Sequence, residues 1–241
     1  MKGKVGIICL ANGPYSIFIP NLVQSCEEKF LLDYEKHYYI FSDTDFESEY
    51  RDKCTLILKE RKGWPGDCLI RPEYSFEVND LASDLDYVYF FNANMFVYSE
   101  VGEEILPDSS GLVGVEHPHY THRNNLQFTY DRNPATRACI PAGEGLIYYQ
   151  ACMWGGTTEA FMKLSKEIKE WVDADLADGV EPIWLDESYL NRYFLNNQPK
   201  TLAPVFAWPT YMTVYDTTPT IKIVQLQKDD YLPKNFRYIT E

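Results

Sequence analysis

The chain has 241 residues, of which 45% are hydrophobic, and this is enough to form the core of one α/β domain. Its formal net charge of −14 argues against a general affinity for nucleic acids or anionic membranes, because those partners require a contiguous basic surface. An anionic ligand must therefore be held by local positive charge. The 19 tyrosines, 13 phenylalanines and 5 tryptophans suit stacking on sugar rings as well as core packing.

The first apolar run, residues 5–10, is too short for the core of a signal peptide or for a membrane span. The six cysteines are widely spaced, form no Cys-x-x-Cys pair and have only four histidines to complete a zinc site. Reduced thiols in a cytoplasmic protein are the simplest interpretation. The sequence contains no repeat or low-complexity linker, so we expect a single domain over residues 1–241.

The predicted elements alternate between strands and helices, which is the pattern of an α/β fold. Residues 5–10 predict a strand, and after a break at Asn12-Gly13-Pro14 a helix is expected to end near Phe30. Two more strands, over residues 37–41 and 54–58, and a helical segment over residues 71–83 complete the first third of the chain.

The central predicted strand covers residues 87–91, whose five apolar or aromatic side chains run directly into Asn92-Ala93-Asn94. An uninterrupted apolar run is typical of a strand that is buried on both faces. Ligands of open α/β sheets bind where such strands end. Asn92 and Asn94 are therefore candidate binding residues, and the alternative is that they only hydrogen-bond a turn, as asparagine often does.

Farther along, the pattern predicts a strand over 111–115, a polar loop over 117–143, a core strand over 145–154 and an amphipathic helix over 157–175. A loop of that length in a compact domain is usually functional or mobile. Asp186 and Glu187 precede a short segment that is predicted to be helical, residues 188–195. On their own, adjacent carboxylates at this position could be N-terminal helix charges that interact favourably with the helix dipole.

Several long motifs occur in an order that resembles glycosyltransferase family 6, the family of the histo-blood-group A and B transferases and of α-1,3-galactosyltransferase. The resemblance begins at Val5 and implies a GT-A fold, a Rossmann-like mixed sheet flanked by helices. It also implies transfer from a UDP-sugar to galactose through an α-1,3 bond with retention of anomeric configuration. The motifs are Phe128-Thr129-Tyr130-Asp131-Arg132, then Ile140-Pro141-x-Gly143-Glu144-Gly145-x-x-Tyr148-Tyr149, then Gly155-Gly156-Thr157, and finally Trp184-x-Asp186-Glu187-Ser188-x-Leu190-Asn191-x-Tyr193-Phe194.

Two features separate this sequence from the animal members of that family. Asn92-Ala93-Asn94 stands where they carry an Asp-x-Asp motif that binds manganese on the UDP diphosphate, and their membrane anchor and stem have no counterpart here. The sequence is more similar in both respects to a soluble bacterial, Bacteroides-type member. Because neutral amides attract a hard divalent cation far less than two carboxylates do, we expect an enzyme that requires no metal and no other cofactor.

The resemblance places the uracil and ribose of the donor at the end of the first predicted strand and in the loop after it. It places Arg71 beside the donor, seven positions after Trp64. Strand-end packing is the alternative for Leu10 and Ala11, and a surface salt bridge is the alternative for Arg71. The two asparagines would hydrogen-bond ribose or sugar hydroxyls through their amides. The expected donor-binding residues in this half of the chain are Leu10, Ala11, Asn12, Tyr15, Arg71, Asn92 and Asn94.

Five downstream residues are implied to set donor and acceptor choice. Gln150, Ala151 and Cys152 occupy the segment that distinguishes UDP-galactose from UDP-N-acetylgalactosamine in the family, and small residues there leave room for an acetamido group. We expect N-acetylgalactosamine, with galactose as the alternative. His117 matches an acceptor-binding histidine and favours a fucosylated, H-antigen-like galactoside, whereas Trp184 offers an apolar face to the acceptor galactose. A solvated histidine and a core tryptophan are the alternatives.

The adjacent carboxylates carry the chemistry in this interpretation. Retention requires a group on the β face of the anomeric carbon, where a carboxylate either attacks or stabilises the developing positive charge. Glu187 is the expected catalytic residue, and Asp186 is expected to hydrogen-bond the hydroxyls of the donor sugar. The sequence leaves open both a covalent intermediate and a front-face mechanism.

Without a metal, the charge that develops on the β-phosphate of UDP must be met by basic side chains. The resemblance implies a C-terminal tail, from about residue 225 to 241, that closes over the diphosphate and offers Lys228, Lys234 and Arg237. Near Trp208, Pro209 replaces an acceptor-binding aspartate of the family. A UDP-sugar-binding or glycan-binding protein without turnover and a UDP-sugar hydrolase are the alternative functions. The oligomeric state is left open.

Overall fold

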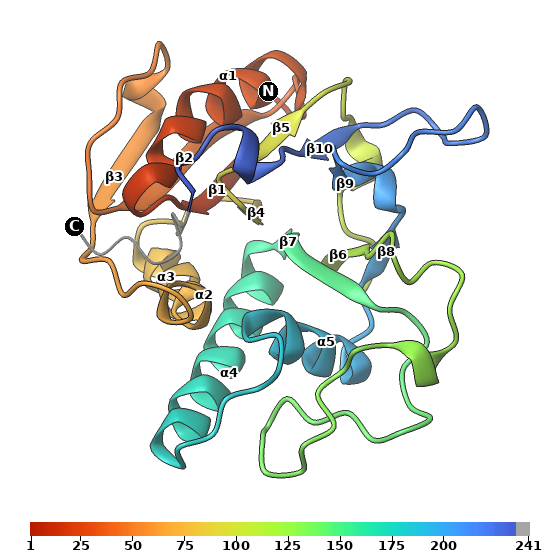
Figure 1. The fold of residues 1–241 in the computed structure, drawn as a ribbon. Coiled ribbons are helices and arrows are strands. Elements are labelled where there is room, and N and C mark those ends of the chain that lie inside the picture. Colours follow the sequence, from red (N-terminus) through yellow and green to blue (C-terminus); the bar gives the residue numbers. More distant parts are fainter. Residues whose placement is uncertain (235–241) are drawn as a thin grey trace.

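A computed structural model of the chain describes residues 1–234 and contains two β-sheets. The central sheet has seven strands in the order β3-β2-β1-β4-β7-β6-β8 (Figure 1). Its strands are β1 (Lys4–Leu10), β2 (Glu35–Ser42), β3 (Cys54–Leu58), β4 (Tyr87–Phe91), β6 (Leu112–Glu116), β7 (Tyr149–Thr157) and β8 (Lys200–Leu202). A smaller sheet has the order β5-β10-β9 and consists of β5 (Met95–Val97), β9 (Trp208–Pro209) and β10 (Ile223–Gln225).

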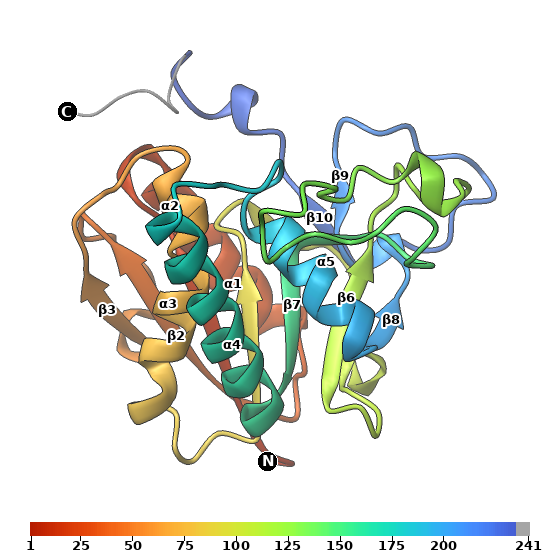
Figure 2. The same cartoon turned by 90° about the horizontal axis from the view of Figure 1, so that it is seen from below.

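Helices cover both faces of the central sheet, as Figure 2 shows. The α-helices are α1 (Ile19–Lys29), α2 (Gly66–Leu69), α3 (Arg71–Glu77), α4 (Thr158–Ala177) and α5 (Asp186–Asn196). Short 3-10 helices occupy Gly13–Phe18, Arg51–Lys53, Val78–Asp80, Glu103–Ile105, Asn125–Gln127, Pro204–Phe206 and Lys228–Asp230. Helix α1 packs on one face, and α3, α4 and α5 pack on the other. The expected α/β architecture, a mixed sheet flanked by helices, is therefore confirmed.

Strand β4 is buried on both faces, as its apolar run predicted. Tyr89 and Phe91 belong to the hydrophobic cluster that includes α1, whereas Val88 and Phe90 belong to the cluster that includes α3, α4 and α5. Alternate side chains of a strand point to opposite faces, so an element sandwiched between two layers must be apolar at every position. After β4 the chain turns at Asn92-Ala93-Asn94 and enters the second sheet as β5.

The strand order creates a switch point beside β1. Strand β1 pairs in parallel with β2 on one side and with β4 on the other, so the loops after β1 and β4 diverge at the same edge of the sheet. Strand β7 runs antiparallel to β4, with Phe91 opposite Met153. The first residues of β7 therefore extend past the end of β4 to this edge, where the backbone NH of Asn92 donates to the carbonyl of Cys152 at 2.8 Å.

Three predicted boundaries are wrong. The helical segment predicted for residues 71–83 ends at Glu77 and continues only as a 3-10 turn to Asp80. Helix α5 begins at Asp186 rather than at Ser188. The core strand predicted for residues 145–154 begins at Tyr149 and continues through two glycines to Thr157.

Close packing explains why those two glycines do not end the strand. A Cβ atom on Gly155 would lie 2.2 Å from a ring carbon of Tyr89, and one on Gly156 would lie 2.2 Å from the carbonyl oxygen of Gly111. The glycines thus allow neighbouring groups to approach β7 closely.

No helix within residues 1–234 combines the length and the apolar character needed to cross a bilayer.

Candidate active site

A cavity of about 430 Å³ lies at the edge of the central sheet where β1 and β4 end. Its walls come from the loops after these strands, the start of β7, the start of α5 and the chain after β10. Most of the predicted site residues line it, namely Leu10, Asn12, Tyr15, Arg71, Asn92, His117, Gln150, Ala151, Cys152, Trp184, Asp186, Glu187 and Lys228. Residues that are far apart in the sequence thus form one site.

Three other predicted residues within 1–234 do not line this cavity. Ala11 is completely buried, Asn94 is 1% exposed, and Lys234 lies on the surface. Arg237 lies outside the described residues.

Asn94 instead holds the chain that follows β10. The side-chain Nδ2 of Asn94 donates to the backbone carbonyl oxygen of Leu226 at 2.7 Å, and the backbone carbonyl oxygen of Asn94 accepts from the Leu226 NH at 2.9 Å. Two residues later, the Nζ atom of Lys228 lies 5.3 Å from the ring centre of Tyr15. The second asparagine of the motif therefore fixes the segment that carries a cation to the cavity.

The sequence analysis missed part of the cavity wall. Asp67 accepts a hydrogen bond from Asn12 Nδ2 at 3.0 Å, and its other oxygen lies 3.8 Å from Arg61 Nε. Arg61 and Asp67 flank the Gly63-Trp64-Pro65-Gly66 turn, and charged residues on both sides of such a turn were the available signal. The added lining residues are Arg61, Trp64, Asp67, Cys68, Ile183, Leu185 and Gln225.

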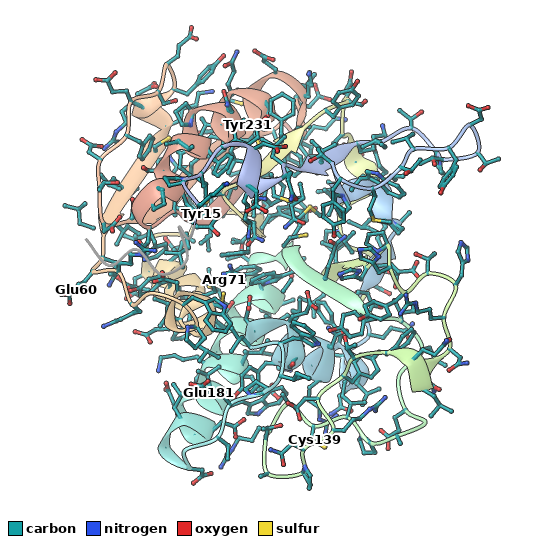
Figure 3. All side chains as sticks on the ribbon, viewed as in Figure 1. Tyr15, Glu60, Arg71, Cys139, Glu181 and Tyr231 are labelled. Atoms are coloured by element: carbon teal, nitrogen blue, oxygen red, sulfur yellow. The ribbon has the colours of Figure 1, made fainter. Side chains whose placement is uncertain are left out.

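Arg71 and Asp186 form an ion pair inside the site. The Arg71 Nη1 atom donates to Asp186 Oδ2 at 2.8 Å across 115 positions of sequence, and both side chains are largely buried. The guanidinium also lies 5.6 Å from the ring centre of Phe90. Figure 3 shows Arg71 and Tyr15 near the centre of the molecule. Burial raises the pKa of Asp186, and the charge of Arg71 opposes this change. Because both side chains are largely buried, the surface salt bridge considered for Arg71 is wrong.

Both carboxylate oxygens of Glu187 are held by the protein. Oε1 accepts from the hydroxyl of Tyr148 at 2.9 Å, and Oε2 accepts from the backbone NH of Ala151 at 3.0 Å. Burial raises the pKa of Glu187 to about 7, although these two hydrogen bonds favour the ionised form. A carboxyl group with a fixed direction and a perturbed pKa, at the wall of a cavity, has the properties of a catalytic group.

Asn191 explains how α5 brings Glu187 to this place. Its side chain pairs with the backbone of Tyr149 like a neighbouring strand, because Nδ2 donates to the carbonyl and Oδ1 accepts from the NH, each at 2.8 Å. The helix is thereby fixed to β7, with Glu187 one turn before Asn191. Leu185, just before the helix, has a φ of 50°, a left-handed conformation that is strained for leucine.

His117 and Trp184 lie on the cavity wall as predicted. His117 Nδ1 accepts from the backbone NH of His119 at 3.2 Å, and burial, assisted by the charge of His119, lowers the pKa of His117 to about 4. The ring is therefore neutral at pH 7 with its proton on Nε2. Trp184 is 49% exposed, so the core-tryptophan alternative is wrong.

Gln150 and Cys152 form a fixed wall, because their polar groups bind each other and the neighbouring backbone. Gln150 Nε2 donates to the carbonyl oxygen of Ala207 at 3.2 Å, and its Oε1 accepts from Cys152 Sγ at 3.1 Å. Both side chains are buried. The shape of this wall is consequently set before any ligand enters.

Residues 1–235 match glycosyltransferase family 6. The chain belongs to this family. It is 31% identical to the O-antigen biosynthesis glycosyltransferase WbnI of Escherichia coli over 227 residues, which cover 93% of this chain and 95% of the relative. It is 29% identical to the histo-blood group ABO system transferase 1 of Rattus norvegicus, with 85% of this chain and 60% of the relative covered. The globoside alpha-1,3-N-acetylgalactosaminyltransferase 1 of Gallus gallus is also 29% identical, with 85% and 61% covered.

Family membership confirms the resemblance seen in the motifs. The mixed sheet and its flanking helices form the GT-A fold. The protein is a UDP-sugar-dependent glycosyltransferase. The chain spans about three fifths of the two animal relatives and nearly all of the bacterial one.

In the described part of the chain, the carboxylates, thiols and imidazole that line the cavity are not grouped as the ligands of a metal ion. Among residues 1–234, no three His, Cys, Asp or Glu side chains are arranged to hold a metal ion. Asn92, which lines the cavity, supplies only a neutral amide. Metal independence stays a prediction, because the diphosphate of the donor can itself supply oxygen ligands.

Proposed function

We propose that this family 6 member is a retaining α-1,3-glycosyltransferase. It moves N-acetylgalactosamine, or alternatively galactose, from a UDP-sugar to the galactose of a fucosylated, H-antigen-like acceptor, and it does so without a metal ion. The observation that carries this proposal is the Glu187 carboxylate, which two hydrogen bonds fix at the wall of the cavity beside the Arg71–Asp186 pair.

Donor binding follows from the charges around the cavity. The overall charge of the chain is strongly negative, so the diphosphate needs a local cation, and Lys228 lies where the chain after β10 meets Tyr15. In the proposed reaction its ammonium group stabilises the charge that builds up on UDP as the glycosidic bond breaks. The uracil and ribose occupy the loop after β1, next to Asn12.

The proposed chemistry takes place at Glu187. As a carboxylate, Glu187 faces the β side of the anomeric carbon and either forms a covalent bond to it or stabilises its positive charge. Asp186, held by Arg71, hydrogen-bonds the donor sugar through its remaining acceptor sites. Neutral His117 and the exposed face of Trp184 bind the acceptor galactose.

The proposed substrates draw on the names of the relatives. One relative is named for O-antigen biosynthesis, one for the ABO histo-blood group system and one for transfer of N-acetylgalactosamine to globoside. These names favour a cell-surface glycan as acceptor and N-acetylgalactosamine as donor sugar.

The six cysteines are free thiols, which favours the reducing environment of the cytoplasm.

UDP release in excess EDTA, measured with and without a fucosylated galactoside, separates this function from its two alternatives. A transferase releases UDP much faster when the acceptor is present. A UDP-sugar hydrolase releases UDP equally well in both cases, and a binding protein releases none. Either of the last two results would overturn the proposal.

A further inference from the structure

The carboxylate of Glu187 rests against a buried tyrosine that does not line the cavity. Tyr148 is 1% exposed, and its hydroxyl donates to Glu187 Oε1 at 2.9 Å. Tyr148 therefore approaches the carboxylate from the protein side. The hydroxyl of Tyr148 therefore acts on the reaction through Glu187, whereas its ring also lies against His117, with ring centres 5.8 Å apart.

Two further hydroxyls extend this hydrogen bond into a chain. Thr129 Oγ1 donates to the Tyr148 oxygen at 3.3 Å and lies 2.7 Å from the hydroxyl of Tyr120. An ionised carboxylate only accepts hydrogen bonds, so the protons along this chain point from Tyr120 through Thr129 and Tyr148 toward Glu187. Hydrogen bonds aligned in this way polarise one another and strengthen the last one.

The tyrosine ring has no room to turn away. It is stacked on Tyr130, with ring centres 5.2 Å apart and 18° between the planes, and its centre lies 4.4 Å from that of Tyr120. Phe128 packs against it at 6.0 Å. The position of the hydroxyl is consequently fixed by aromatic packing in the 117–143 loop and by the chain of hydrogen bonds.

We infer that Tyr148 is a positioning residue for the glycosyl transfer, which orients the Glu187 carboxylate toward the cavity as the last member of the Tyr120–Thr129–Tyr148 hydroxyl chain. This role rests on the proposed function of Glu187. It also gives the long polar loop a part in the reaction, because Tyr120 and Thr129 both belong to that loop.

The electrostatics of Glu187 make the role measurable. Burial is the largest influence and raises the pKa of Glu187 to about 7, whereas the Ala151 NH and the Tyr148 hydroxyl lower it. Asp186 raises it and Arg71 lowers it, and the neutral thiol of Cys152 and the ammonium group of Lys228 are further ionisable groups of the same cavity. Replacing Tyr148 by phenylalanine removes one of the two hydrogen bonds to the ionised form, so the pKa of Glu187 must rise further.

Tyr148→Phe and Tyr130→Phe are the matched pair for the test. Tyr130 is also buried, and its hydroxyl donates to the carbonyl of Ile147 at 2.7 Å rather than to Glu187. Each variant loses one hydroxyl from the same aromatic cluster. Melting curves and circular dichroism of both proteins verify that they fold.

The readouts are the pH profile of kcat/KM and the titration of the Glu187 carboxyl by carbon-13 NMR, with the signal assigned from its loss in Glu187→Gln. For Tyr148→Phe, both midpoints should move up by about one pH unit or more, with a roughly fivefold or greater loss of kcat/KM at pH 7 and unchanged UDP affinity. Tyr130→Phe should leave both midpoints in place.

Two results would overturn the inference while leaving the proposed function intact, since Glu187→Gln would still lower transfer strongly. One is an unchanged Glu187 midpoint in Tyr148→Phe, and the other is an equal shift in both variants. A different result, full transfer activity of Glu187→Gln, would overturn the proposed function itself and the positioning role with it.

Discussion

Replacing Asn94 by aspartate restores one carboxylate of the animal motif, yet the structure predicts a loss of function. The Asn94 amide donates to the Leu226 carbonyl at 2.7 Å, in a place where the side chain is only 1% exposed. An ionised aspartate has no proton to donate. Its oxygen would face the Leu226 carbonyl oxygen, and both groups would lack a partner away from water.

The size of the effect follows from that lost pairing. Leaving a buried acceptor without its donor costs about 1–3 kcal/mol, which corresponds to a roughly 5- to 150-fold change in an equilibrium. The equilibrium concerned is the docking of the segment after Leu226, which carries Lys228 to the cavity. UDP should therefore bind about 5- to 150-fold more weakly to Asn94→Asp.

Isothermal titration of UDP in EDTA, together with kcat/KM for transfer, measures this effect. Two controls separate lost pairing from added charge. Asn94→Leu removes the amide donor without adding charge and should also weaken binding, whereas Asn92→Asp adds charge at the cavity wall and leaves the Leu226 pairing intact. Wild-type UDP affinity in Asn94→Leu, or restoration of Asn94→Asp by manganese, would refute the reasoning.

Three more predictions concern the charged groups of the cavity. Glu187→Gln should lower kcat by roughly a hundredfold or more with little change in UDP affinity, because the loss falls on the transition state, and equal loss of UDP binding would instead make Glu187 structural. Lys228→Met should weaken UDP binding roughly tenfold or more, whereas the same change at surface-exposed Lys234 should have little effect; similar results for both variants would remove Lys228 from the mechanism. Since burial raises the pKa of Glu187 to about 7 and the reaction uses the ionised form, kcat/KM should rise as the pH increases through about 7, and a flat profile from pH 5.5 to 8.5 would contradict this assignment.

Much of the site was predictable because it lies where the fold places ligands. The apolar run of β4 identified a strand buried on both faces, and the strand-end rule then pointed to Asn92, whereas the loop after β1 was implied by the family resemblance. The motif around Asp186 and Glu187 identified the carboxylates. Each of these signals is local in sequence, so one stretch of residues carried it.

What the sequence could not provide was the direction of individual side chains. Asn92 and Asn94 are two positions apart in a turn, yet one lines the cavity and the other binds Leu226. The pairing of Arg71 with Asp186 and that of Tyr148 with Glu187 each join distant segments, and both depend on how α5 packs against the sheet. That packing results from tertiary contacts that no local pattern encodes.

The glycines of β7 show that local sequence also failed to predict where a strand ends. Gly155 and Gly156 predicted the end of a strand, because glycine weakens strands in general. In the fold they lie against the Tyr89 ring and the Gly111 carbonyl oxygen, where a side chain has no room. The same residues thus mark close packing, which only the three-dimensional neighbours reveal.

The structure of the transfer product tests the central claim most directly. The protein, UDP-N-acetylgalactosamine and a fucosylated galactoside are incubated in excess EDTA, and the product linkage is determined by NMR. The account predicts an α-1,3-linked N-acetylgalactosamine on the galactose, formed at a rate that added manganese changes little. A β-linked product, UDP release without a glycoside product, or a product that forms only after manganese is added would contradict it.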